Sequence, residues 1–260
     1  MHSRLTAMFA GLAMSALAGT AHAIPVDLEL SLVIDSSGSI DAGEFSQQID
    51  GYAEAFRQTT VVDSIAATPN GIAVNTILFA SDASEVITFQ HLQTEADVLD
   101  FADQLAAIER VTGGTDIADG INLAVETLNT NQFESGNVII DVSGDGAQNV
   151  AGGDPAASRD AALSAGVSRI NGIAIGNQNI FDFYQANVIG GTDAFVLQAE
   201  SFDEFDAAIA NKIGLEVGAP APAPPPPAAP PVLVPAPGAI GLIGFGVLAL
   251  GLVMRRRPKV

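Results

Sequence analysis

Strand-like and helix-like patterns alternate along residues 24–217, and this alternation limits the fold more than any other feature of the sequence. Short runs rich in Val, Ile and Leu are separated by longer segments whose apolar residues recur at helical spacing. This order predicts an α/β fold, a Rossmann-like doubly wound and mainly parallel sheet with helices on both faces. The predicted strands are residues 28–34, 71–80, 85–89, 137–142, 170–175 and 194–198, and the predicted helices are residues 45–56, 98–108, 117–128, 156–165, 180–188 and 202–213.

The predicted domain is strongly acidic and has no cysteine. All 30 acidic residues of the chain lie in it, and five basic residues set against those 30 give a formal charge of −25. Such a surface repels nucleic acid, so we exclude nucleic acid as a partner. Because no disulfide can form, an exported domain of this kind depends on its core and on any bound metal for stability.

Both ends of the chain carry features of export. Residues 1–23 combine a basic start, an apolar stretch and an Ala-His-Ala cleavage site, which predicts a signal peptide ahead of the domain at 24–217. Residues 218–237 are mostly Pro and Ala and predict an extended linker. Residues 238–254 carry no charge and predict a short transmembrane or sorting helix, followed by a basic cytoplasmic tail at 255–260. We therefore expect an exported protein at the cell surface or outside the cell, at least transiently anchored in the membrane.

Three polar segments, far apart in the sequence, are predicted to meet at one edge of the sheet. Asp35-Ser36-Ser37-Gly38-Ser39 and Ser143-Gly144-Asp145-Gly146 each follow a predicted strand, and Thr112-Gly113-Gly114-Thr115-Asp116 lies between two predicted helices. In open sheets of this type, ligands bind where parallel strands end. Two carboxylates and three hydroxyls from these segments would supply ligands of the kind that magnesium, calcium and manganese prefer. Such a sparse set leaves one position of the ion open for a carboxylate from outside.

Each segment also has a simpler interpretation. Asp and Ser favour turns, and the Gly-Gly-Thr-Asp segment equally fits a helix cap made by Thr115 or Asp116. We interpret Asp116 and Asp119 as part of an exposed helical face. Asp41 and Glu44 stand where a helix begins and suit its dipole, so we expect them to be structural.

The three segments in this order resemble a von Willebrand factor type A (VWA) domain with its metal-ion-dependent adhesion site (MIDAS), over roughly residues 26–216. That family carries Asp-x-Ser-x-Ser on the first loop, a Thr on the second and an Asp on the third. The resemblance implies a metal site made by Asp35, Ser37, Ser39, Thr115 and Asp145. It implies direct contacts from the hydroxyls, direct or water-mediated contacts from the carboxylates, and Mg²⁺ as the cation, with Ca²⁺ or Mn²⁺ as alternatives.

Two further resemblances concern export. Residues 140–146 and 170–172 look like those of a subgroup of uncharacterised secreted bacterial VWA members. The segment from Val234 to the end resembles a PEP-CTERM sorting signal, whose proteins are thought to be cut by an exosortase. Ala236 stands where that signal usually has Glu, so both cleavage and a permanent anchor stay open.

The resemblance implies a binding or adhesion module that uses its metal to bridge to an acidic group on a protein or an acidic glycan, and we expect no enzyme. One alternative is a metal-dependent, phosphatase-like hydrolase with Asp35 as nucleophile. Against it, Ser37 replaces a second acid, the domain has no lysine except Lys212, and no Gly-x-Ser-x-Gly elbow is present. A Ser–His pair would depend on His91 alone, which we interpret as structural. The other alternative is a structural component of the envelope or matrix.

Overall fold

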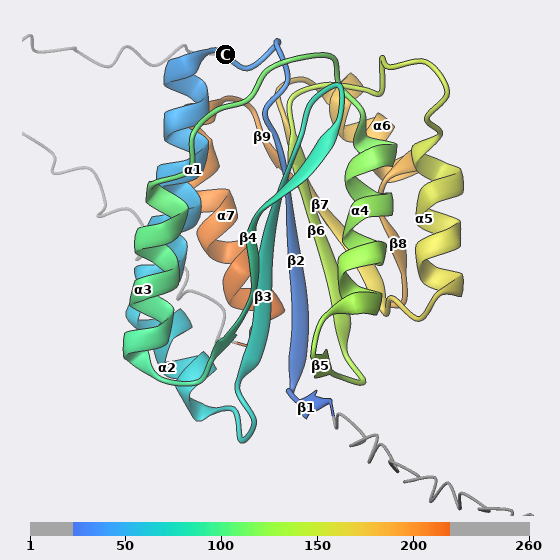
Figure 1. Cartoon of the computed structure of the whole chain (residues 1–260). Helices are drawn as coiled ribbons and strands as arrows, with labels where there is room; N and C mark the ends of the chain where they lie inside the picture. The colour runs from blue at the N-terminus through green and yellow to red at the C-terminus, as the bar shows by residue number, and fades with distance from the viewer. Residues whose placement is uncertain (1–22, 219–260) are drawn as a thin grey trace, which may run out of the picture. The chain divides into compact units, whose positions relative to one another are not determined.

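The computed structural model describes residues 23–218, which are built around one twisted sheet (Figure 1). Its strands are β2 (Leu28–Asp35), β3 (Ile72–Phe79), β4 (Ala83–Leu92), β6 (Val138–Gly144), β7 (Arg169–Ile175), β8 (Gly190–Gly191) and β9 (Val196–Ala199). The order is β4-β3-β2-β6-β7, and both β8 and β9 pair with β7. The pairs β3-β2, β2-β6, β6-β7 and β7-β9 are parallel, and β4 is an antiparallel edge strand. The predicted α/β class with a mainly parallel sheet is confirmed.

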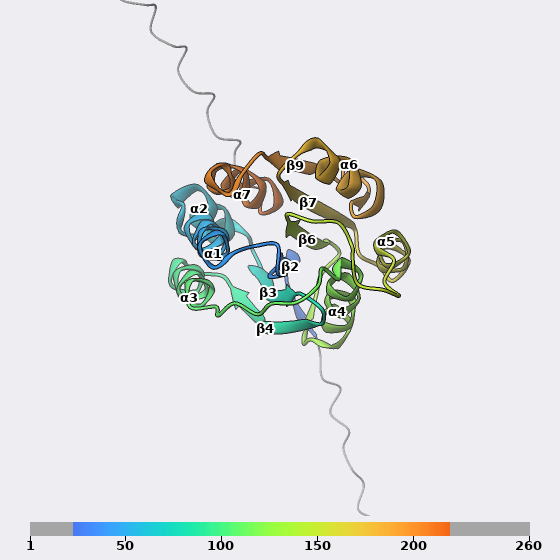
Figure 2. The ribbon, with the colours of Figure 1, turned by 90° about the horizontal axis from the view of Figure 1, so that it is seen from above.

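Helices cover both faces of this sheet, as Figure 2 shows from above. They are α1 (Ala42–Arg57), α2 (Thr59–Ala67), α3 (Glu95–Ala106), α4 (Ile117–Thr130), α5 (Pro155–Ser164), α6 (Gln178–Asn187) and α7 (Phe202–Glu216). The first three and α7 share one hydrophobic core with the sheet, and α4, α5 and α6 share a second core on the opposite face. Every residue of β2 and β3 is buried, as expected for central strands covered on both sides. Tyr52 and Phe205 pack across α1 and α7 with ring centroids 5.6 Å apart.

Capping residues define two helix starts that the sequence indicated. Thr94 accepts a hydrogen bond from the Asp97 backbone N–H, and the Asp97 side chain accepts one from the Thr94 N–H. Asp41 and Glu44 form the same reciprocal box at the start of α1. The structural interpretation of Asp41 and Glu44 is therefore confirmed, since each satisfies backbone groups that a helix start leaves free.

A buried ion cluster joins α7 to the sheet. The Lys212 ammonium contacts Asp141 on β6 and lies 2.6 Å from Glu216 Oε1. Asn171 on β7 donates to the same Glu216 oxygen at 2.8 Å. The side chains of Lys212, Asp141 and Glu216 are all fully shielded from solvent. Because buried charges are tolerated only when paired, Lys212 is needed to balance the charge of the two buried carboxylates.

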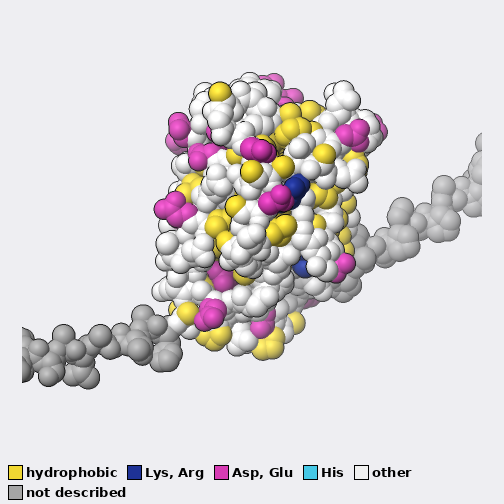
Figure 3. Space-filling model, turned by 90° about the vertical axis from the view of Figure 1, so that its right-hand side faces the viewer, with side chains coloured by type: hydrophobic (Ala, Val, Ile, Leu, Met, Phe, Trp, Pro, Cys, Tyr) yellow, Lys and Arg dark blue, Asp and Glu magenta, His cyan; other side chains and the backbone are white. Residues whose placement is uncertain are grey.

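Most charged groups on the surface of the domain are carboxylates. Figure 3 shows acidic groups spread over the face that α5 occupies and few basic ones between them. The five basic residues of the domain are Arg57, Arg110, Arg159, Arg169 and Lys212.

Several predictions concern the two ends of the chain. Residues 1–22 of the predicted signal peptide, the linker after Gly218, the helix at 238–254 and the tail at 255–260 lie outside the described residues. Within residues 23–218, no helix has the length and apolar character needed to cross a membrane.

Candidate metal centre

The first loop begins where β2 ends, in the middle of the sheet. Asp35 is the last residue of that strand and is fully buried. Its Oδ1 accepts the backbone N–H of Ser37 at 2.8 Å, and the side-chain oxygens of Ser37 and Ser39 are 3.0 Å apart. Gln48 of α1 donates to the Asp35 carbonyl at 2.8 Å. The turn therefore presents one carboxylate and two hydroxyls as a fixed group.

The second loop crosses above the sheet from α3 to α4 and is held against the first loop (Figure 2). The Gly38 N–H donates to the Gly113 carbonyl at 2.9 Å, and the Asp116 N–H donates to the Ala80 carbonyl at 2.9 Å. A Cβ on Gly113 would lie only 2.5 Å from the hydroxyl oxygen of Ser81. The glycine is thus required for this close approach between loop and strand end.

The third loop leaves β6, the strand next to β2, and brings Asp145 to the first loop. Ile34 and Ser143 are partners in the parallel register, which places the two strand ends side by side. Ser39 Oγ donates to Asp145 Oδ1 at 2.7 Å. Thr115 and Ser39 approach the same loop, because a Cβ on Gly146 would lie 3.7 Å from Thr115 Oγ1 and 3.9 Å from Ser39 Oγ.

All five predicted ligands thus lie at one edge of the sheet, on three separate loops (residues 35–39, 112–116 and 143–146), which we call the metal loops. The sequence-based expectation about Asp116 and Asp119 was wrong in part. Asp116 is only 9% exposed and caps α4 by accepting the Asp119 N–H at 3.1 Å, which is the cap that the sequence left open. Asp119 accepts the Ala83 N–H at 2.7 Å and so ties α4 to β4. Both carboxylates satisfy backbone donors and do not form an exposed face.

Comparisons with known proteins identify the family and the fold of this chain. Residues 25–221 match the model of a family described as protein of unknown function (DUF1194). The chain belongs to the DUF1194 family. A search of curated proteins finds no match to this DUF1194 chain.

Solved structures show that the DUF1194 domain has a VWA-like fold. Proximal thread matrix protein 1 (PTMP1) from the mussel byssus matches with a TM-score of 0.55 and 18% identity, over 75% of this chain and 46% of that one. The pilus adhesin SpaC from Lactobacillus rhamnosus GG matches with 0.54 and 14%, over 74% and 30%. A mutant of the PilB minor pilin from Streptococcus sanguinis matches with 0.53 and 14%, over 74% and 62%. This chain therefore spans less than two thirds of each of them. PTMP1 has also been solved with a zinc-occupied MIDAS motif.

The donor set in the DUF1194 domain suits a divalent cation. Asp35 Oδ2 is buried without a hydrogen-bond partner, and so is the nearby hydroxyl of Tyr184. A buried carboxylate oxygen with no donor is unfavourable, and a bound cation or its water would satisfy it. The other groups at this edge are hydroxyls and a second carboxylate, which match the oxygen ligands of hard cations.

Burial controls the ionisation of both carboxylates. It raises the pKa of Asp35 to about 7, against the opposing effect of the Ser37 hydrogen bonds. Burial also raises the pKa of Asp145, and the negative charge of Glu44 adds to that rise. Burial thus disfavours the charged form of both carboxyls, and a bound cation would favour that charged form and lower both pKa values.

Several residues that support the loops were not predicted. Asn149 accepts the Thr115 N–H at 2.8 Å and donates to Thr115 Oγ1 at 3.2 Å, which orients that hydroxyl. Arg110 donates to the carbonyls of Ser37 and Ile40 and so holds the first loop from outside. These contacts join positions 34 and 73 residues apart, and no local pattern in the sequence indicates them.

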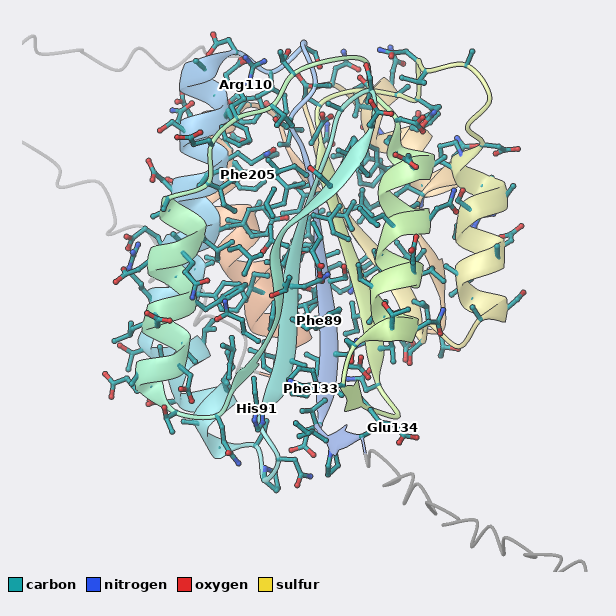
Figure 4. The ribbon with its side chains drawn as sticks, in the orientation of Figure 1. Phe89, His91, Arg110, Phe133, Glu134 and Phe205 are labelled. Carbon is teal, nitrogen blue, oxygen red and sulfur yellow. The ribbon has the colours of Figure 1, made fainter. Side chains whose placement is uncertain are left out.

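His91 and Lys212, the two residues that the hydrolase alternatives raised, both lie away from Asp35. His91 Nε2 contacts the Asn70 carbonyl at 2.7 Å. Figure 4 shows His91 at the end of the sheet opposite to Arg110 and the metal loops. The Lys212 ammonium is buried and paired with Asp141. Neither residue can act on a substrate bound beside Asp35.

Gly144 offers a test of how tightly the loops are packed. A Cβ at this position would lie 2.6 Å from both Asp35 Oδ2 and the Tyr184 hydroxyl. Gly144→Ala should therefore displace Asp35, lower the free energy of unfolding by roughly 1–3 kcal/mol and weaken metal binding. Gly136→Ala is the matched control, because a Cβ there meets nothing within 4 Å. Denaturant unfolding and magnesium titration of both variants would measure the effect, and equal behaviour would contradict the geometry.

Proposed function

We propose that residues 24–217 form a binding module that holds a divalent cation at Asp35, Ser37, Ser39, Thr115 and Asp145 and uses it to contact an acidic group on a partner. The observation that carries the proposal is the link between distant loops. The Ser39 hydroxyl lies 2.7 Å from Asp145 and 3.0 Å from the Ser37 hydroxyl, which joins the loop after β2 to the loop after β6.

The charges of the site support a bridging role. Two carboxylates balance the charge of a divalent cation, and the remaining protein ligands are neutral hydroxyls. Because the loaded site then has no net negative charge, it does not repel a further carboxylate from a protein or an acidic glycan, and that carboxylate can fill the last position on the ion. Magnesium is the first choice for this oxygen set, and calcium or manganese are the alternatives. The zinc-occupied MIDAS motif of PTMP1 supports divalent metal binding on this fold.

The structural relatives and the two ends of the sequence support a role in adhesion outside the cell. Two structural relatives are a byssus matrix protein and a pilus adhesin. We propose that residues 1–23 direct export and that the Pro/Ala-rich linker at 218–237 separates the domain from the helix at 238–254 and the tail at 255–260. The domain would then be displayed at the cell surface, either with the helix as a lasting anchor or after cleavage by an exosortase.

A binding role fits the site better than hydrolysis does. A phosphatase-like mechanism at Asp35 needs a positive group to steady the phosphoryl oxygens. In the described part of the chain, Arg110 is the basic residue beside the metal loops, and its guanidinium is engaged with the carbonyls of Ser37 and Ile40.

Asp145→Asn tests the metal-bridging role. The variant keeps an acceptor for the Ser39 hydroxyl but removes a negative charge, so magnesium affinity should fall at least about tenfold while the fold is retained. Isothermal titration with MgCl₂ would measure the affinity. Line broadening of glutarate in NMR spectra would report carboxylate binding, which we expect only for the wild-type protein loaded with magnesium.

Asp63→Asn is the matched control, because Asp63 is exposed on α2, far from the loops in the fold. It should bind magnesium and glutarate like the wild-type protein. Glutarate broadening that persists in EDTA would contradict metal bridging. If Asp145→Asn bound magnesium as tightly as the wild-type protein, the proposed metal site would be wrong, and a structural role in the matrix would be favoured.

A further inference from the structure

A second concave site lies on the flank of the domain. It is a cavity of about 290 Å³ between β4, the C-terminal end of α4 and the short strand β5 (Phe133–Glu134). Figure 4 shows Phe89 and Phe133 in the lower half of the molecule, whereas Arg110 marks the metal loops at the upper end. The cavity is therefore separate from the metal centre.

An irregularity in the edge strand shapes this cavity. In a regular strand, successive side chains point to opposite faces of the sheet. The pairing of β3 with β4 shifts register on both sides of Thr76, and Thr88 and Phe89 both line the cavity although they are neighbours in sequence. A bulge that turns side chains in this way is a frequent feature of functional edges. Here it sets a hydroxyl beside an aromatic ring.

A buried asparagine holds the polar wall of the cavity in place. Asn75 on β3 is fully buried, and its amide donates to Glu85 Oε1 at 2.8 Å and to Thr127 Oγ1 at 3.2 Å. Glu85 and Thr127 both line the cavity. The Thr127 hydroxyl also donates to the Ala124 carbonyl at 3.1 Å, which fixes its orientation. No residue in 23–218 hydrogen-bonds the second carboxylate oxygen of Glu85, so that oxygen remains available as an acceptor.

The chemistry of the lining selects a class of ligand. It combines a partly exposed Phe89 ring, one carboxylate and several hydroxyl and amide groups, and no lysine or arginine lines the cavity. An anionic ligand would be repelled by Glu85, because no basic side chain lines this cavity to offset that charge. A sugar ring offers an apolar face for the aromatic ring and hydroxyls for the polar wall. The volume is at the lower end of the range for ligand pockets and suits one ring.

We propose that the cavity between β4 and α4 binds a neutral sugar ring without a metal, with Phe89 against its apolar face and Glu85 and Thr88 bonded to its hydroxyls. This site is independent of the cation-dependent contact at the metal loops. It gives the domain a second way to hold a glycan.

Saturation-transfer NMR of the purified protein in EDTA tests this site. The probes are glucose, galactose, mannose, N-acetylglucosamine and their methyl glycosides, and at least one of them should bind. Glu85→Gln should weaken that binding about tenfold or more, because the hydrogen bonds to a charged acceptor are lost while the Asn75 contact is kept. Thr88→Val, at an exposed position, should weaken it severalfold.

Thr60→Val is the control for an exposed threonine on α2 and should bind like the wild-type protein. Binding of a methyl glycoside would point to a sugar within a chain, and binding of only the free sugars would point to a monosaccharide; either outcome supports the site. Absence of binding to every probe at millimolar concentration would overturn it. So would equal binding by Glu85→Gln and Thr88→Val, or tighter binding of choline than of any sugar.

Discussion

Replacing Asp35 with asparagine should abolish magnesium binding and, at the same time, stabilise the metal-free protein at neutral pH. Asparagine has the shape of the aspartate and can still accept the Ser37 N–H that Asp35 accepts at 2.8 Å. It loses the negative charge, and magnesium affinity should fall by at least about a hundredfold. Isothermal titration with MgCl₂ would measure the loss.

The gain in stability follows from the ionisation of Asp35. Burial raises its pKa from 3.8 to about 7 in the folded protein. Between these values the folded protein keeps a proton that the unfolded chain releases, so the free energy of unfolding falls as the pH rises through this window. Above pH 7 the free energy of unfolding has fallen by roughly 4 kcal/mol, and Asp35→Asn does not show this fall because asparagine does not ionise. For a domain of this size the melting temperature should rise on the order of 10 °C.

Thermal denaturation in EDTA at about pH 4 and about pH 8 would show this effect as a smaller pH dependence in the variant. Asp63→Asn, at an exposed position of α2, should follow the wild-type protein at both pH values. A lower melting temperature for Asp35→Asn at pH 8, or a magnesium-dependent rise equal to that of the wild-type protein, would contradict the assignment of Asp35.

The strands and most helices could be predicted because their signals are local. A run such as Leu28–Asp35 is mostly apolar because a central parallel strand is buried on both faces, and the structure buries every residue of it. The reciprocal bonds of Thr94 and Asp97 are formed within one helical turn, so the sequence alone indicated where α3 begins. In such segments the local preference and the tertiary fold agree.

Elements that depend on tertiary contacts escaped prediction. Helix α2 begins with Thr59-Thr60-Val61-Val62, β-branched residues that disfavour a helix, and it lacks a side-chain cap. Its buried Val61, Val62 and Ile65 belong to the core shared with α1, α3 and α7, and this packing decides the conformation. The two-residue strand β5 and its partner β1 (Ile24–Pro25) are too short for any periodic pattern.

The positions of the candidate ligands could be predicted from the sequence, but the residues that hold them in place could not. Asp35 and Asp145 follow adjacent parallel strands, and topology alone brings such positions together. Asn149 and Arg110 act through hydrogen bonds to Thr115 and Ser37, whose geometry depends on the paths of two long loops. The burial of Asp116 was missed for the same reason, because a helix cap and an exposed acid look alike in sequence.

Replacing Lys212 with methionine should cause the largest loss of stability in the domain. Its ammonium contacts Asp141 and lies 2.6 Å from Glu216, and all three side chains are fully shielded. Removing the one cation leaves two buried carboxylates without a counter-charge, which typically costs about 3–5 kcal/mol. Urea denaturation at about pH 8 would measure the change in the free energy of unfolding.

The loss should be smaller in mild acid. In the wild-type protein the pKa of Asp141 is raised to about 7, because burial and the charge of Glu216 raise it more than Lys212 lowers it. Without Lys212 that opposition disappears, so the folded variant takes up a proton more readily than the unfolded chain. The free energy of unfolding of Lys212→Met should therefore fall more steeply with rising pH than that of the wild-type protein.

Two further variants separate burial from simple loss of an ion pair. Arg57 also contacts two acids, Glu54 and Asp103, but these are 70% and 75% exposed, so Arg57→Met should cost less than about 1 kcal/mol. Glu216→Gln leaves Lys212 facing Asp141 alone, one cation against one anion, and should stay within about 1 kcal/mol of the wild-type protein. If Lys212→Met were as stable as Arg57→Met at pH 8, the buried cluster would not be what fastens α7 to the sheet, and the apolar contacts of Phe205 and its neighbours would have to account for that attachment.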